Sequence, residues 1–127
     1  MKTLRTPLSK VKGLGSAKSG TEHFLMQRVT ALALIPLVIW FCMSIAFLPE
    51  ANYSAIVSWL ASPLNAVLMI VTLLSGFYHA ALGIQLILED YISSHGTRFI
   101  AIIVSNLLLF FFAALGIFSV LKIAISA

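Results

Sequence analysis

Residues 64–88 read LNAVLMIVTLLSGFYHAALGIQLIL, a stretch without a single Asp, Glu, Lys or Arg. A run of roughly 20 apolar residues is long enough to cross a bilayer, and in lipid the backbone must satisfy its own hydrogen bonds as a helix. Two further uncharged runs, Val29–Leu48 and Phe99–Leu121, meet the same length requirement. The sequence therefore predicts an all-α membrane protein with three transmembrane helices.

The composition excludes an ordinary soluble domain. Hydrophobic residues make up 61% of the chain and charged residues 9%, whereas a typical soluble domain has about 25% charged residues. The single cysteine, Cys42, lies inside the first apolar run, so the chain can form no internal disulfide and no thiol cluster for a metal. We expect two parts: a basic cytoplasmic segment over residues 1–28 and a three-helix anchor domain over residues 29–127.

Basic residues are concentrated before the first apolar run. Of the eight Lys and Arg, only Arg98 and Lys122 come later. Because Lys and Arg are enriched on the cytoplasmic side of membrane proteins, we predict a cytoplasmic N-terminus, a cytoplasmic Glu89–Arg98 loop and an external C-terminus. Attraction to anionic lipid accounts for the spaced basic residues without any nucleic acid. We expect a multi-pass protein of the bacterial inner membrane, or of the mitochondrial inner membrane if the chain is organellar.

The segment between the first two runs, Pro49–Pro63, contains no Lys or Arg and is expected to face outward. Tyr53 and Trp59 within it are aromatic residues of the kind enriched where a membrane meets water. The centre of this segment, Ala55–Leu60, is expected to form a short helix on the membrane surface.

His79 lies in the middle of the second apolar run. A titratable ring at mid-membrane depth is costly, so it is a functional-site candidate by default. The residues that share its helix face are mostly small or polar: Thr72, Ser75, His79, Gly83, Leu86 and Asp90. Small residues let another helix or a flat ligand approach closely.

Gly83 lies one turn from His79 and removes a side chain that would strike a ring plane bound to the imidazole. Because His is a common axial ligand of haem iron, the pattern predicts a haem site. Plain helix packing, with His79 hydrogen-bonded to a neighbour, stays open as the alternative. His23 and His95 lie near the predicted cytoplasmic surface and are interpreted as interfacial histidines with ordinary hydrogen bonds. We therefore expect the second ligand to come from another subunit or a second copy of the chain.

Asp90 and Tyr91 follow His79 by about three helical turns, a rise of ~16 Å that places an acid and a phenol at the membrane surface. A phenol can donate a hydrogen bond to a quinone carbonyl, and a nearby carboxylate can relay protons. Arg28, on the same predicted side, is a candidate partner for haem propionates or the quinone. The alternative is that these three residues only mark the membrane boundary.

The motifs SG at 19–20, HF at 23–24, QRVTA at 27–31, HAALG at 79–83 and DY at 90–91 carry a family resemblance. They resemble the D-type membrane anchor subunits of succinate dehydrogenase, respiratory complex II, in particular those of alphaproteobacteria. The resemblance covers roughly Ser19 to Tyr91 together with the three-helix layout. The spacing from His79 through Gly83 to Asp90 and Tyr91 is its most specific part.

The resemblance implies that His79 is the axial iron ligand of haem b and that Arg28 lies near the haem propionates and the quinone pocket. It implies that Tyr91 and Asp90 form the quinone-site pair, with Tyr91 donating to a carbonyl of ubiquinone, the substrate. The chain would then be half of a heterodimeric haem-binding bundle, completed by the C-type anchor of such complexes, a cytochrome b-type membrane protein. The partners would also include an iron–sulfur subunit, a flavoprotein subunit and membrane lipid.

Enzyme activity, on this interpretation, belongs to the complex. The chain has no Rossmann fingerprint and no cysteine cluster, so it holds no succinate-oxidising centre. Three other functions stay open: a homodimeric b-type cytochrome-like electron carrier with His79 from two copies, a non-enzymatic membrane accessory subunit, and a proton-conducting subunit using His79 and Asp90. The last needs a water path that the apolar Leu82 and Leu86 do not favour.

Overall fold

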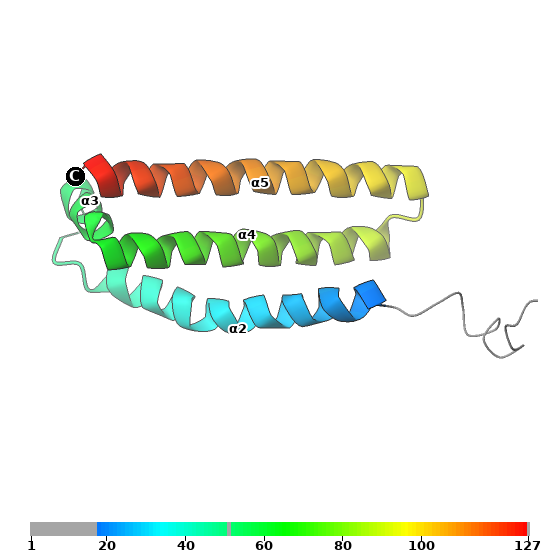
Figure 1. Ribbon diagram of the computed structural model, residues 1–127, viewed down its shortest axis with the longest axis horizontal. Coiled ribbons are helices and arrows are strands. Elements are labelled where there is room, and N and C mark those ends of the chain that lie inside the picture. The colour runs from blue at the N-terminus through cyan, green and yellow to red at the C-terminus, as the bar shows by residue number, and fades with distance from the viewer. Residues whose placement is uncertain (1–17, 51, 127) are drawn as a thin grey trace, which may run out of the picture.

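The computed structural model describes residues 18–50 and 52–126 of the chain. Four helices follow one another: α2 (Lys18–Ala46), α3 (Tyr53–Ala61), α4 (Pro63–Tyr91) and α5 (His95–Ser126). These described residues form no strand. Figure 1 shows α2, α4 and α5 as long rods, with α4 in the middle and antiparallel to both, and with the short α3 at one end. The predicted all-α architecture is confirmed.

Three of the helices are long and apolar enough to cross a membrane, over Gly20–Ala46, Pro63–Tyr91 and His95–Ser126. This confirms the three predicted spans. The helices extend beyond most of the predicted limits of about 29–48, 64–88 and 99–121, but α2 ends at Ala46, two residues before its predicted end. The uncharged runs mark the part that suits hydrocarbon, whereas a helix continues through polar residues at the membrane surface. With 29 residues each, α2 and α4 are ~43 Å long, close to the full bilayer thickness including headgroups.

The basic segment predicted over residues 1–28 lies only partly within the described part of the chain. Residues 1–17 lie outside the described part of the chain, and residues 18–28 belong to the first turns of α2. At the opposite end of α2, the short helix predicted between Pro49 and Pro63 is present as α3. The Asn52 side chain caps α3 by accepting a hydrogen bond of 2.8 Å from the Ala55 amide.

Local sequence signals set the limits of α4. Pro63 occupies its first turn, where a residue without an N–H costs nothing and the fixed backbone angle suits a helix. The helix ends at Tyr91 because Ile92 is extended. Only a short connection then leads to α5, so α4 and α5 are antiparallel neighbours.

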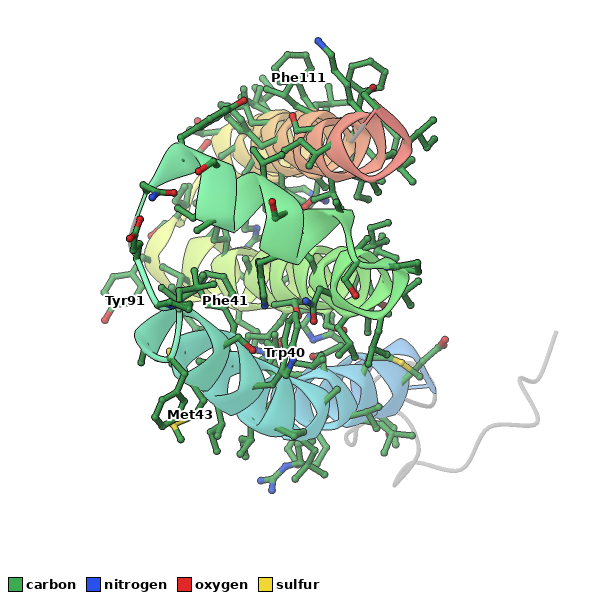
Figure 2. The ribbon with its side chains drawn as sticks, turned by 90° about the vertical axis from the view of Figure 1, so that its left-hand side faces the viewer. Trp40, Phe41, Met43, Tyr91 and Phe111 are labelled. Carbon is green, nitrogen blue, oxygen red and sulfur yellow. The ribbon has the colours of Figure 1, made fainter. Side chains whose placement is uncertain are left out.

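The long helices form a single layer. α4 packs against both α2 and α5, whereas the described residues of α2 and α5 do not approach each other closely along their backbones. Figures 1 and 2 both show this row, with α4 between its neighbours. Among the described residues, few side chains are buried: Leu60, Ala66, Leu82, Val120 and Thr30. The broad faces of the layer are apolar and exposed, as expected for surfaces that meet lipid or other membrane subunits.

The best-packed end of the layer lies around α3. Leu60 of α3 packs with Ala66 of α4 and Val120 of α5. The rings of Trp40 in α2 and Trp59 in α3 stack with their centroids 5.6 Å apart. This end is therefore closed by side chains of the chain itself. The other end, where α2 begins and α4 joins α5, carries Asp90 and Tyr91 of the candidate site, whereas His79 lies near the middle of α4.

Candidate functional site

His79 is held in the seam between α2 and α4. Its Nδ1 lies 3.0 Å from the hydroxyl oxygen of Thr30, which belongs to α2. Thr30 is 9% exposed and is the only buried polar residue in the described part of the chain. His79 itself is half-buried. The hydrogen bond therefore fixes the imidazole between two helices that are far apart in sequence.

Small residues on α4 bring the two helices close on either side of His79. A Cβ added at Gly83 would lie 3.5 Å from Nε2 of Gln27, and one added at Gly76 would lie 3.9 Å from a methyl group of Leu34. Residue numbers along α4 decrease from Gly83 to Gly76, while those of the facing residues of α2 increase from Gln27 to Leu34. The two helices are therefore antiparallel. The helix face that carries His79 is thus turned toward α2.

The α2 helix also lies against Gly83, whose role toward a bound ring plane stays a prediction. The sequence suggested that its missing side chain clears space for a ring plane, but the Gln27 amide lies against it. A stripe of small residues serves a neighbouring helix as well as a flat ligand, and the sequence pattern is the same in both cases. The hydrogen bond expected under the helix-packing alternative is also present, although it uses only one of the two ring nitrogens.

Asp90 and Tyr91 form the exposed end of α4. Both side chains are exposed, and Tyr91 has 83% of its surface accessible. Figure 2 shows the Tyr91 ring pointing away from the layer of helices. The acid and the phenol therefore face the surroundings of this chain. A molecule bound between them needs further walls from partner subunits.

Arg28 lies apart from both groups. Its guanidinium stands over the ring of Phe24, 4.5 Å from the centroid, and the side chain is exposed. Within the described residues it forms no hydrogen bond or ion pair with Asp90 or Tyr91. Its neighbour Gln27 faces α4, and successive helix residues are separated by about 100°, so Arg28 points to a different side of α2.

A cavity that the sequence analysis missed lies between α2 and α4, near the end that carries Asp90 and Tyr91. Its volume is about 460 Å³. It is lined by polar and apolar side chains from both helices: Gly20, His23, Phe24, Gln27, Gln85, Leu86 and Glu89. The Gln85 amide donates a hydrogen bond of 2.8 Å to the Glu89 carboxylate.

Two polar atoms of this cavity have no hydrogen-bond partner within the described part of the chain, namely Nε2 of His23 and Oε1 of Gln27. Within the described residues, Nε2 of His23 thus lacks the hydrogen bond expected of an interfacial histidine, and that expectation stays a prediction. The available signal was the spacing of His23, Gln27 and Thr30, which places three polar residues on the face of α2 that meets α4. The cavity thus brings polar side chains of both helices together beside the apolar Leu86.

The other histidine behaves as predicted. His95 is exposed at the start of α5, where its Nδ1 lies 3.3 Å from a guanidinium nitrogen of Arg98. The same guanidinium donates a hydrogen bond of 3.5 Å to the Glu89 carbonyl oxygen, which links the end of α4 to the start of α5. In residues 18–50 and 52–126, no three His, Cys, Asp or Glu side chains gather as a metal site.

The sequence matches a known family over nearly its whole length. Residues 2–119 match the family model for the succinate dehydrogenase/fumarate reductase transmembrane subunit. The succinate dehydrogenase hydrophobic membrane anchor subunit of Rickettsia conorii is 36% identical over 104 residues, which are 81% of this chain and 82% of the relative.

Two further relatives have the same description. That of Rickettsia bellii is 35% identical over 94 residues, covering 74% of this chain and 75% of the relative. That of Paracoccus denitrificans is 27% identical over 122 residues, covering 96% and 94%. Together with three helices long enough to span a membrane, these matches agree with the resemblance seen in the motifs around His79 and Tyr91. The chain belongs to the succinate dehydrogenase/fumarate reductase transmembrane subunit family.

Proposed function

We propose that this chain anchors a succinate:quinone oxidoreductase in the membrane, binds haem b through His79 and forms part of the ubiquinone-reduction site through Tyr91 and Asp90. The observation that carries the proposal is the imidazole of His79, held between two spanning helices by only one of its ring nitrogens. The same helix ends in an exposed acid and phenol. The relatives are described as membrane anchor subunits of succinate dehydrogenase, which supports the assignment to such a complex.

The side chains fit an iron ligand at His79. Thr30 is the only hydrogen-bond partner of the ring among the described residues, and it engages Nδ1. Nε2 is thus available, and a neutral imidazole nitrogen is a common ligand of haem iron. Haem b bound there would supply a one-electron redox centre inside the membrane. The second ligand is assigned to the sister C-type anchor, as the family resemblance implies.

Tyr91 and Asp90 fit a quinone site at the end of α4. Reduction of a quinone consumes protons as well as electrons, so the site needs a hydrogen-bond donor and a path to water. The Tyr91 hydroxyl can donate to a quinone carbonyl, and the exposed Asp90 carboxylate can pass a proton from solvent toward it. Both side chains are exposed in this chain. In the proposed complex, the iron–sulfur subunit and the C-type anchor would cover them and complete the walls of the quinone site.

Arg28 is the third residue of the proposed site. An exposed guanidinium carries five donors in a planar fork, which suits the carboxylates of haem propionates. In this chain its charge rests on the face of Phe24 alone. A partner subunit that docks on this side of α2 would bring an anionic group to it.

Orientation in the membrane completes the proposal. Figure 1 places the start of α2 beside the connection between α4 and α5. Arg28 and Arg98 both lie toward this end, whereas Lys122 lies toward the other. By the positive-inside rule this end is cytoplasmic, which is also the side where the iron–sulfur and flavoprotein subunits would deliver electrons from succinate.

Purification of a tagged copy from its own membranes tests this function. We expect a flavoprotein, an iron–sulfur subunit and a second small membrane subunit to co-purify, with a b-type absorption spectrum and succinate:quinone reductase activity. Chain purified without partners but with a haem spectrum would instead indicate a homodimeric cytochrome. If neither partner subunits nor haem co-purify, the proposal is refuted, and the function that remains is that of a non-enzymatic membrane accessory subunit.

A further inference from the structure

We infer that Thr30 is a positioning residue for metal binding: its hydroxyl oxygen accepts the Nδ1–H of His79 and thereby leaves Nε2 as the ligating nitrogen. This inference rests on the proposed ligand role of His79. It adds a residue of α2 to a site whose chemistry lies on α4. It also places the proton of the neutral His79 ring on Nδ1.

The hydroxyl of Thr30 has three neighbours within hydrogen-bond distance. Its oxygen lies 2.8 Å from the carbonyl oxygen of Met26, 3.1 Å from that of Gln27 and 3.0 Å from Nδ1 of His79. Bonds from a threonine hydroxyl to the carbonyl one turn earlier are common in helices. The two carbonyl contacts and the contact with the ring must be satisfied by one hydroxyl proton and one ring proton.

Only one distribution of these protons satisfies the shortest contacts. A carbonyl oxygen has no hydrogen, so the contact of 2.8 Å with Met26 is favourable only if the Thr30 hydroxyl donates it. With its single proton used there, the hydroxyl oxygen can only accept from the ring. Nδ1 of His79 must then carry the hydrogen. In a neutral imidazole this leaves the lone pair on Nε2.

The opposite distribution is disfavoured by burial. If the hydroxyl donated to Nδ1, two oxygen lone pairs would face each other across 2.8 Å at Met26. Thr30 is 9% exposed, and at a buried position an unsatisfied polar contact costs about 1–3 kcal/mol. The surroundings of Thr30 therefore hold the ring in one tautomer before any metal binds.

The helix packing keeps this geometry in place. His79 lies between Gly83, which meets Gln27, and Gly76, which meets Leu34. These small residues let α2 approach α4 closely enough for a short threonine side chain to reach the ring. Metal-binding histidines generally donate their second N–H to an acceptor, which orients the ring and raises the basicity of the ligating nitrogen. Thr30 occupies the place of that acceptor.

Four variants of this chain, each purified in the assembled complex, test the inference. Thr30→Val removes the acceptor and keeps the branched shape, whereas Thr30→Ser keeps a hydroxyl. Thr72→Val is the matched control, because the Thr72 hydroxyl bonds the Leu68 carbonyl at 2.7 Å in the same manner but bonds no histidine of the described residues. His79→Leu reports on the ligand role itself.

The readouts are the electron paramagnetic resonance spectrum of the oxidised haem and the rate at which haem passes to an excess of apomyoglobin. We expect Thr30→Val to shift the low-spin signal. Loss of such an acceptor usually lowers metal affinity by roughly 10- to 100-fold, so we expect this variant to lose haem faster than the parent by up to that factor. Thr30→Ser and Thr72→Val should resemble the parent. If Thr30→Val does not assemble, Thr30→Ala removes the hydroxyl without adding a methyl group against the ring and replaces it in the comparison.

The failures of the two proposals are distinguishable. A parent-like Thr30→Val complex, alongside a His79→Leu complex with altered haem, overturns the inference and leaves the ligand role of His79 intact. Equal changes in Thr30→Val and Thr30→Ser also overturn it, since shape rather than the hydroxyl would then matter. An unchanged spectrum in His79→Leu overturns the ligand role and the inference together.

Discussion

At the scale of single residues, the candidate site consists of groups with very different surroundings. His79 is half-buried and tied to the buried Thr30, whereas Asp90, Tyr91 and Arg28 are exposed. The imidazole is thus oriented by this chain alone. The other three side chains face the surroundings of this chain, and in the proposed complex their final geometry would depend on the subunits that cover them.

Tyr91→Phe isolates the role of the phenol hydroxyl. The variant keeps the ring, which is 83% exposed in this chain, and therefore leaves the packing of α4 unaltered. Loss of one well-placed hydrogen bond costs about 0.5–1.5 kcal/mol, a fall of roughly two- to tenfold in binding. We expect succinate:quinone activity to fall by at least this factor while succinate oxidation with a soluble dye stays near normal. An unchanged ratio of quinone-linked to dye-linked activity would show that Tyr91 is only an interfacial aromatic.

Asp90→Asn tests proton supply at the same end of α4. The amide preserves the size of the carboxylate but cannot accept and pass on a proton. We expect quinone-linked activity to fall with haem content unaltered. Glu89→Gln is the matched control, since the Glu89 carboxylate is already bonded to Gln85. Equal losses in the two variants would point to a general effect of charge at this surface rather than to Asp90.

The residue scale also shows where sequence reasoning stops. His79, Asp90 and Tyr91 stand out because a polar residue in or beside an apolar run is unusual. Thr30 does not stand out, because a threonine in a membrane helix can satisfy its hydroxyl on its own backbone. Its contact with His79 depends on the register of α2 against α4, which a single sequence does not determine.

At the scale of helices, the seam between α2 and α4 positions the imidazole. The length of the apolar runs was sufficient to predict three spans, because backbone satisfaction in lipid leaves no other choice. The face of α4 that carries His79 was also predictable from its period. The sequence did not show what packs against that face. In the structure it is α2, with Gln27 against Gly83.

Gly83→Leu tests this close approach. A Cβ at this position would already touch the Gln27 amide at 3.5 Å, so a larger side chain must push α2 away from α4 and stretch the bond between Thr30 and His79. Overpacking of this kind typically costs about 1–3 kcal/mol. We expect a lower midpoint temperature of unfolding and faster haem loss in the assembled complex.

Gly96→Leu serves as the control for that variant, because no described atom lies within 4 Å of a Cβ added at Gly96. Gly83→Ala should be tolerated, since 3.5 Å is an ordinary contact distance. Equal stability of the Gly83→Leu and Gly96→Leu complexes would contradict the packing described for α2 and α4.

At the scale of the whole molecule, the single layer of helices explains why the proposed haem and quinone sites would need partner subunits. One α-helical layer buries little, and large apolar side chains such as Phe111, labelled in Figure 2, remain exposed. Lipid covers such surfaces, but it cannot supply a second iron ligand or the walls of a quinone pocket. The number of partners cannot be read from the sequence, since an exposed apolar face looks the same toward lipid and toward protein.

The proposed topology belongs to this scale as well. Reporters fused to the C-terminus should be active only outside the cytoplasm, and labels in the Glu89–Arg98 loop should react only from the cytoplasmic side. Moving the excess of basic charge, by replacing Arg98 with Gln and adding Lys after residue 127, should raise the fraction of inverted molecules. A cytoplasmic C-terminus in the parent chain would contradict the orientation.

The central claim is that His79 of this chain is an axial ligand of haem b in an assembled succinate dehydrogenase. The most direct measurement is the reduced-minus-oxidised absorption spectrum of purified His79→Leu complex, with His95→Gln as the matched control because His95 is exposed and remote from the seam. We predict loss or marked change of the b-type spectrum in His79→Leu, with dye-linked succinate oxidation retained, and a parent spectrum in His95→Gln. A fully assembled His79→Leu complex with an unaltered haem spectrum would contradict the claim.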